Sequence, residues 1–163
     1  MLVGVISDTH NNTKNIKKII YLLNKEKVDI VIHTGDISKS QTLRMFSELK
    51  CELVGVFGNN DRIEHDLQKV CSEYNFKFQE PPMFMTLEGI RFAVFHEPEL
   101  IKDYTEKLKD FDVILHGHTH RYREEIIDET IYFNPGESAG MMLGKNTLGI
   151  IDLKNLKIKR IFF

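Results

Sequence analysis

Short runs of β-branched and other apolar residues alternate with segments of helical periodicity through the first half of the chain. The runs are Val3–Ile6, Val28–Ile32 and Leu53–Phe57, and each has the length of one buried strand. After them, apolar residues recur at helical spacing: Ile16, Ile19, Ile20 and Leu23, then Leu43, Phe46 and Leu49, then Ile63, Leu67 and Val70. Asn11 and Asn12 precede the first of these segments and suit a helix N-cap. The alternation predicts right-handed β-α-β crossovers and a mostly parallel sheet, with the carboxyl ends of its strands along one edge.

The second half of the chain indicates mainly strands. Phe84–Leu87 and Ile90–Phe95 flank Glu88–Gly89, a pair typical of a hairpin turn. One short helix is also predicted, with three apolar residues on one face: Ile101, Tyr104 and Leu108. Further strands are expected at 112–115, 123–127, 130–133, 147–152 and 157–162. We therefore predict an α/β fold of two-layered mixed β-sheets flanked by helices, and a single domain over residues 1–163 because no repeat or Pro/Gly-rich linker divides the chain.

Composition and charge narrow the class of protein. Hydrophobic residues make up 42% of the 163 residues and charged residues 28%, the balance of an ordinary globular domain. A formal net charge of −2 is too close to neutral for a protein that coats nucleic acid or a membrane surface. Cys51 and Cys71 are far apart and form no CxxC pair, which favours a reducing compartment. Leu2–Ile6 is too short for the apolar region of a signal peptide, and no apolar stretch approaches the roughly 20 residues of a membrane span, so we expect a cytoplasmic protein.

Polar residues follow five of the predicted strands at the point where each strand ends. These segments are Ser7–His10, His33–Asp36, Gly58–Asp61, His96 and His116–His120. In open α/β sheets, ligands bind in the crevice beyond the carboxyl ends of the strands. In an extended segment, residues two apart point the same way, so Asp8 and His10 are expected to converge, as are His118 and His120. Five successive strands that deliver Asp, His or Asn to one edge are hard to attribute to turn preference alone.

The types of residue in these segments suit a pair of metal ions. The carboxylate of Asp36 can offer one oxygen to each of two cations, while Gly35 and Gly58 leave room for close approach beside a ligand. Imidazole, carboxylate and amide donors without thiolate favour Mn, Fe, Co, Ni or Zn. Two divalent cations outweigh the negative charge of Asp8, Asp36 and a hydroxide, so the site can attract a phosphoryl group.

Taken in order, these motifs resemble those of the calcineurin-like metallophosphoesterase superfamily, and the short chain is similar to its small YfcE-like phosphodiesterases. The motifs are Asp8-x-His10, Gly35-Asp36, Gly58-Asn59-x-Asp61, an isolated His96 and Gly117-His118-x-His120. The resemblance implies one metal ion bound by Asp8, His10, Asp36 and His120. It implies a second metal ion bound by Asp36, Asn59, His96 and His118. Mn²⁺ is the first expectation for both, with Ni²⁺, Co²⁺, Fe²⁺ and Zn²⁺ as alternatives.

Two positions depart from the family pattern. Many relatives have a histidine directly after the ligand Asn, where it is thought to protonate the leaving group, but this chain has Asn60. Glu97-Pro98 follows His96 where relatives often have Gly-His. Asn134-Pro135-Gly136-Glu137 does resemble the late Asn-Pro-Gly segment of the family, and its Pro-Gly pair suits a type II turn.

Several polar residues beside the motifs have more than one interpretation. His33 and His116 are expected to be near-core or supporting histidines and not ligands, and His65 to lie on the surface of the third helix. Asn60 and Asp61 could contact substrate or cap the helix that follows. The apolar terminus Ile161-Phe162-Phe163 could pack internally or meet another subunit in a homo-oligomer.

The expected function is hydrolysis of a phosphodiester bond in a small substrate by a hydroxide that bridges two metal ions. Asp36, Asn59 and His96 are the expected catalytic residues, and Asn60 and Asp61 the expected substrate contacts. A phosphomonoesterase or a nuclease with the same metals is one alternative, although the missing histidine favours diesters and the near-neutral charge disfavours extended nucleic acid. A catalytically silent, protein-binding scaffold of the same fold is the other.

Overall fold

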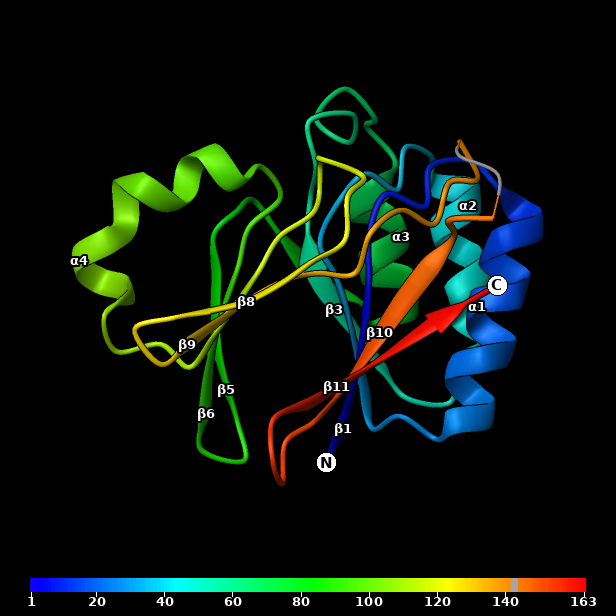
Figure 1. Ribbon diagram of the computed structural model, residues 1–163. Coiled ribbons are helices and arrows are strands. Elements are labelled where there is room, and N and C mark those ends of the chain that lie inside the picture. The colour runs from blue at the N-terminus through cyan, green and yellow to red at the C-terminus, as the bar shows by residue number, and fades with distance from the viewer. Residues whose placement is uncertain (142–143) are drawn as a thin grey trace.

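Two β-sheets lie face to face in the computed structural model, which describes residues 1–141 and 144–163 (Figure 1). The first sheet has the strand order β11-β10-β1-β2-β3-β4. Its strands are β1 (Leu2–Ile6), β2 (Ile30–His33), β3 (Glu52–Val56), β4 (Lys77–Gln79), β10 (Thr147–Asp152) and β11 (Lys157–Phe162). β1 to β4 run parallel, whereas β10 and β11 are antiparallel additions at one side. The mostly parallel sheet predicted from the first half is confirmed, and β4 is a strand that the sequence did not indicate.

The second sheet has the order β5-β6-β7-β9-β8. Its strands are β5 (Met83–Leu87), β6 (Ile90–Val94), β7 (Val113–Leu115), β8 (Arg123–Ile127) and β9 (Thr130–Asn134). β6, β7 and β9 are parallel, while the edge strands β5 and β8 are antiparallel to their neighbours. Both sheets are therefore mixed, as predicted, and the carboxyl ends of their parallel strands carry the loops of the candidate site.

Helices cover the outer faces of the two sheets. They are α1 (Thr13–Glu26), α2 (Ser40–Met45), η1 (Phe46–Glu48), α3 (Leu67–Tyr74), η2 (Pro98–Tyr104) and α4 (Thr105–Leu108). The prediction that Ile63 belongs to the third helix is wrong: it lies in a turn before α3 and is 81% exposed. His65 lies in a second turn directly before α3, exposed but not helical. Across the described residues, no helix is long and apolar enough to span a membrane.

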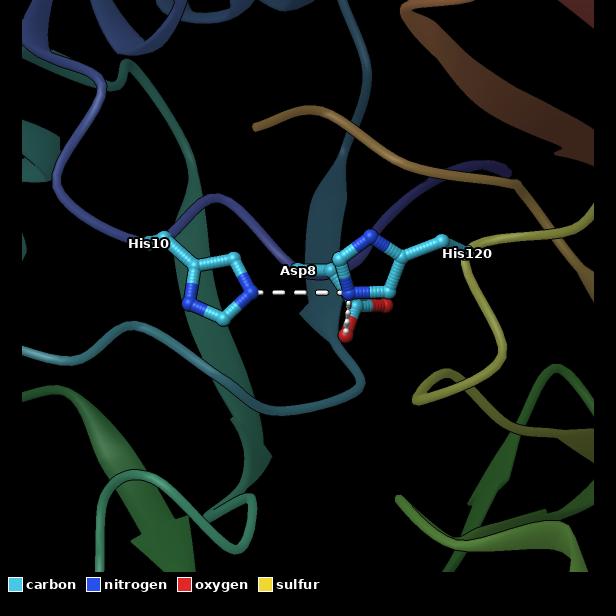
Figure 2. A group of neighbouring side chains, drawn as sticks. All are labelled: Asp8, His10 and His120. Atoms are coloured by element: carbon cyan, nitrogen blue, oxygen red, sulfur yellow. Dashed lines mark hydrogen bonds and ion pairs between the residues drawn. The ribbon is translucent and has the colours of Figure 1, made fainter. Parts of the chain in front are cut away.

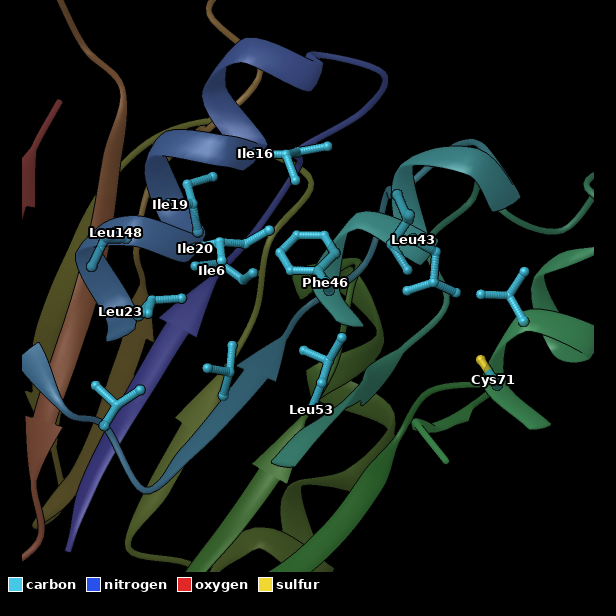
Figure 3. Close-up of a cluster of buried hydrophobic side chains, with 14 of the residues drawn as sticks. Ile6, Ile16, Ile19, Ile20, Leu23, Leu43, Phe46, Leu53, Cys71 and Leu148 are labelled. Atoms are coloured by element: carbon cyan, nitrogen blue, oxygen red, sulfur yellow. The ribbon is translucent and has the colours of Figure 1, made fainter. Parts of the chain in front are cut away.

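The core is divided by the pleat of the strands. On β1, Val3 and Val5 pack into the cluster between the two sheets, while Ile6 points to the cluster under α1, α2 and α3 (Figure 3). β2 and β3 alternate in the same way, because a parallel sheet covered on both faces buries both sets of side chains. A third, smaller cluster joins the second sheet to η2 and α4 through Phe95 and Ile101. Both faces of the strands that lead into the candidate site are therefore packed.

Asn12 is the N-cap of α1, and it also ties the helix to a distant loop. Its Oδ1 accepts the backbone N–H of Asn15 at 3.0 Å, and its Nδ2 donates to the carbonyl of Ala139 at 2.7 Å. Of the two candidate caps, the structure therefore selects Asn12. α1 in turn follows the loop that carries Asp8 and His10.

Replacement of Asn12 by Ala should lower the free energy of unfolding by about 1–2 kcal/mol, because the cap and the bond to Ala139 are both lost. Thermal or denaturant unfolding measures this loss. Asn11→Ala is the matched control, since the exposed Asn11 side chain makes no hydrogen bond within the described part of the chain. Equal losses in the two variants would contradict this view of the cap.

Candidate metal centre

Five loops meet where the carboxyl ends of the parallel strands come together. They follow β1, β2 and β3 of the first sheet and β6 and β7 of the second. Hydrogen bonds join the loops across the two sheets: the backbone N–H of His118 donates to Oδ2 of Asp8 at 3.2 Å, and Nδ1 of His96 lies 2.8 Å from the carbonyl oxygen of Thr34. The structure thus brings the side chains of both sheets into one cluster.

Asp8, His10 and His120 form the first group of possible metal donors, all within 4.8 Å of one another (Figure 2). Nε2 of His120 lies 3.3 Å from Oδ1 of Asp8 and 3.5 Å from Nε2 of His10. Oδ2 of Asp36 completes this side of the centre, 3.8 Å from Nε2 of His10. These are the four residues that the family resemblance assigned to one metal ion.

A second group surrounds Oδ1 of Asn59. This oxygen lies 3.0 Å from Nε2 of His96 and 3.0 Å from Nδ1 of His118, and Oδ1 of Asp36 lies 3.4 Å from the same His96 nitrogen. Asp8, Asp36 and His96 also come within 4.8 Å of one another, so Asp8 borders both groups. Asn59 and His118 are exposed, which leaves this second group open to solvent.

Asp36 stands between the two groups and faces each with a different oxygen: Oδ2 faces His10, and Oδ1 faces His96. Burial raises the pKa of this carboxyl group, but the hydrogen bonds and charge of His96 and the hydrogen bonds of Asn60 outweigh burial and hold the pKa well below its ordinary value. Asp36 is therefore an ionised carboxylate at neutral pH, as a bridging ligand must be.

Three of the imidazoles are oriented from behind. Nδ1 of His96 contacts a backbone carbonyl, Nδ1 of His10 lies 2.9 Å from Oγ of Ser38, and Nδ1 of His120 lies 3.3 Å from Oε2 of Glu137. A carbonyl oxygen only accepts, so the Nδ1 of His96 carries the proton. Its Nε2 then presents a lone pair to the centre, which is the arrangement typical of metal-binding histidines.

The backbone at these positions is unusual. Asp8, His10, Asp36, His118 and His120 all have positive φ, between 43° and 66°. Non-glycine residues seldom adopt this region, and clusters of such residues mark functional sites. The expectation of extended segments is therefore wrong. Asp8 and His10 still converge, but His120 joins them while His118 turns to the second group, beside Asn59.

Gly35 and Gly58 have the roles that the sequence predicted. Gly35 has a φ of 107°, and a Cβ there would lie 2.5 Å from Nδ1 of His96. A Cβ on Gly58 would overlap the carboxylate of Asp36. Both positions require glycine because the metal-centre side chains occupy the space.

Asp61 is buried, and its carboxylate accepts four backbone N–H groups. Oδ2 accepts from Asp36 and Gly58, and Oδ1 accepts from Ile37 and Ser38, at distances between 2.7 and 2.9 Å. With both oxygens occupied, Asp61 holds the loop that positions Asp36. This geometry argues against the substrate contact expected for Asp61, and the helix cap is excluded because α3 begins at Leu67.

Asn60 is exposed, and its side chain is turned toward Asp36. Its Nδ2 donates to Oδ2 of Asp36 at 2.7 Å, and its backbone N–H donates to Oδ1 at 3.0 Å. Asn60 therefore fixes the orientation of the Asp36 carboxylate. It does not cap α3.

The histidines expected near the core are buried, as predicted. Burial lowers the pKa of His33 to about 3 and that of His116 to about 4, so both are neutral at pH 7. Nδ1 of His33 accepts the N–H of Gly35 at 3.1 Å, and its Nε2 lies 3.0 Å from Oγ1 of Thr9. His33 thus holds together the two loops that carry Asp8 and Asp36.

Glu137 ends the late segment that resembles that of the family, but no role was predicted for it from the sequence. It is 1% exposed and places Oε2 beside His120, on the side away from Asp8. Gly136 before it has a φ of 86°, as a type II turn requires at its third position. A carboxylate directly after a turn that returns to the site is a signal that could have identified it.

The donors present fit divalent cations. Asp8 and Asp36 are almost completely buried, and Oδ1 of Asp8 has no hydrogen-bond partner in the described structure. Two buried carboxylates are costly unless positive charge lies between them. Burial lowers the pKa of His96, but the nearby carboxylates of Asp36 and Asp8 outweigh burial and raise it, because they favour positive charge at this position.

Comparisons with known proteins agree with this geometry. A family model described as the calcineurin-like phosphoesterase superfamily domain matches residues 1–156. A phosphodiesterase of Methanocaldococcus jannaschii is 29% identical over 163 residues, which cover 99% of this chain and 98% of the relative.

Two solved structures share the fold. That of an archaeal phosphodiesterase superposes with a TM-score of 0.91 at 29% identity and covers 100% of both chains. That of Yfce, a phosphoesterase from E. coli, has a TM-score of 0.73 at 18% identity and covers 99% of this chain and 98% of its own. The α/β fold and its two sheets are therefore those of this structural group.

Glu137→Gln should weaken metal binding about 10- to 100-fold, because the amide holds the His120 imidazole less firmly than the carboxylate does. Titration calorimetry with Mn²⁺, after removal of metal with EDTA, measures the change without reference to activity. Glu125→Gln, at an exposed carboxylate that pairs with Arg123, is the control. Unchanged affinity in the Glu137 variant would show that its contact with His120 is only structural.

Proposed function

We propose that this chain, which belongs to the calcineurin-like phosphoesterase superfamily, uses two metal ions to hydrolyse a phosphodiester bond in a small substrate. The observation that carries the proposal is the position of Asp36. Its two oxygens face two separate groups of donors, Oδ2 toward His10 and Oδ1 toward His96. A carboxylate placed in this way suits a pair of cations better than one.

The proposed ligands of the first metal ion are Asp8, His10, Asp36 and His120, and those of the second are Asp36, Asn59, His96 and His118. We infer Mn²⁺ as the first choice, with Ni²⁺, Co²⁺, Fe²⁺ or Zn²⁺ as alternatives, because imidazole, carboxylate and amide donors without thiolate suit these metals. When bound, such ions lower the pKa of water, orient the phosphoryl group and stabilise charge on its oxygens.

The protein's own residues position the reactants. In the proposed reaction, water adds to phosphorus and one P–O ester bond breaks, which yields a phosphomonoester and an alcohol. Asn59 and His118 lie on the open side of the centre, where a substrate arrives from solvent. Asn60 keeps Asp36 oriented through its 2.7 Å hydrogen bond. Because Asn60 cannot deliver a proton as an imidazolium can, departure of the alcohol depends on its own acidity.

A phosphodiester is favoured over the alternatives. The absence of a histidine at position 60 disfavours monoesters with poor leaving groups, and a net charge of −2 disfavours extended nucleic acid. A protein-binding scaffold has no need for donors held at positive φ, which is a strained and costly arrangement.

We also propose that the protein acts in the cytoplasm as one domain. Cys51 and Cys71 are free thiols, and burial raises the pKa of each to about 11, which keeps them protonated and unreactive.

At the C-terminus, Ile161 and Phe163 pack against the cluster under α1, while Phe162 is 59% exposed. Phe162 is thus the most exposed side chain of this terminus.

Asp36→Ala should reduce turnover of bis(p-nitrophenyl) phosphate by on the order of a thousandfold or more, since both donor groups lose a ligand. The assay compares Mn²⁺, Ni²⁺, Co²⁺, Zn²⁺ and Mg²⁺, each added alone to EDTA-treated protein. Asp110→Ala, at an exposed position, should keep full activity. Retained activity in the Asp36 variant would reject the proposal, and inactive wild type with every metal would favour a scaffold.

Asn60→His should broaden the range of leaving groups, because an imidazole at this position can donate a proton. The measurement is the dependence of kcat/KM on leaving-group pKa across a series of aryl phosphodiesters, and the slope should become less steep. Asn60→Ala separates the new proton donor from loss of the bond to Asp36. A slope as steep as that of wild type would exclude this explanation of the departure.

A further inference from the structure

A hollow of about 460 Å³ opens beside the metal centre, with His120 in its wall. It is bounded by β11 and by the loop that leads into β8, and its principal side chains are Arg121, Tyr122, Lys145, Arg160 and Phe162. Because His120 belongs to both the hollow and the first donor group, the hollow adjoins the candidate centre at this residue. A role for the hollow in substrate binding rests on the proposed phosphodiesterase function.

The hollow is positively charged. Arg121, Lys145 and Arg160 line it, and none of the lining residues that the structure describes is acidic. The remaining arginines of the chain each pair with a carboxylate: Arg44, Arg62, Arg91 and Arg123. Arg121 and Arg160 form no such ion pair within residues 1–141 and 144–163, so their charge is available to a ligand.

Arg160 is held in place by two aromatic rings. Its guanidinium carbon lies 3.8 Å from the ring centre of Tyr122 and 4.4 Å from that of Phe162. The Tyr122 hydroxyl donates to Glu124, which anchors that ring in turn. The two rings lie against the guanidinium carbon, and the N–H groups make no hydrogen bond or ion pair within the described residues, so they can donate to two oxygens of a phosphate. The cation is thus oriented before any ligand arrives.

We propose that this hollow binds a second phosphate group of the substrate, so that the preferred substrates are phosphodiesters with a further phosphate on one arm. The chemistry favours phosphate, because two guanidinium groups and an ammonium group suit a dianion with three oxygens. The negative charge of Glu137 lies behind His120, buried and outside the lining, and does not neutralise the hollow. Recognition of the second phosphate is separate from the cleavage itself.

The test uses a matched pair of substrates, thymidine 5′-(p-nitrophenyl phosphate) with and without a 3′-phosphate, and the Mn²⁺-loaded protein. Wild type should prefer the 3′-phosphorylated compound in kcat/KM. Arg160→Gln and Arg121→Gln should each reduce that preference by about fivefold, the loss of roughly one hydrogen bond to a charged group at an exposed site. The reduced preference should come from a higher KM for the 3′-phosphorylated compound. The kcat of each variant on the simple diester should stay within twofold of wild type. Lys159→Gln is the control, because Lys159 neighbours Arg160 on β11 but pairs with Glu26 at 2.6 Å.

Binding of thymidine 3′,5′-bisphosphate, measured by calorimetry in the same four proteins, separates this proposal from the proposed function. A weaker affinity in the two arginine variants supports the phosphate subsite even if no protein turns over either substrate, and that result would count against the hydrolytic function alone. Equal substrate preference in wild type and variants, or equal affinity for the bisphosphate, would overturn the subsite.

Discussion

The candidate metal centre depends on two carboxylates, those of Asp8 and Asp36. Both are buried where the strand ends of the two sheets meet. Removal of a carboxylate from water is costly, and two in close proximity also repel each other. Imidazoles surround them, and Oδ1 of Asp8 has no hydrogen-bond partner within the described residues. We propose that a pair of divalent cations offsets this cost, with the surrounding loops positioning the side chains that would hold them.

The rest of the molecule stabilises backbone conformations in these loops that are unfavourable on their own. Five of the proposed ligands have positive φ, a backbone region that costs on the order of 1 kcal/mol or more per residue outside glycine. The strands before these loops are covered on both faces, and Asp61 gathers four N–H groups of the loops that hold Asp36. The packed sheets and the buried carboxylate of Asp61 therefore offset the strain.

The sequence predicted the architecture because its signals are local. Most strands were placed to within a residue or two, and the position of polar residues after them identified one edge as the site. Strand β2 begins at Ile30 and not at Val28, and Ile63 lies outside α3, because tertiary packing decides where a periodic segment ends. β4 was missed because Lys77–Gln79 has only three residues, two of which are polar.

The relations between loops could not be read from the sequence. His118 and His120 point to different donor groups because the backbone is left-handed at both residues. Their spacing in the sequence does not reveal this. Three of the four N–H groups that Asp61 accepts lie more than twenty positions away, and Glu137 reaches His120 only after β9 has returned the chain to the site. In each case these contacts are with residues that are brought close by folding and are distant in the sequence.

Anomalous diffraction from crystals of the protein grown with Mn²⁺ tests the dinuclear centre most directly. Two separate peaks are expected, one beside Asp8, His10 and His120 and the other beside Asn59, His96 and His118, with Asp36 in contact with both. A single peak, or peaks that Asp36 does not join, would contradict a centre built on a shared carboxylate.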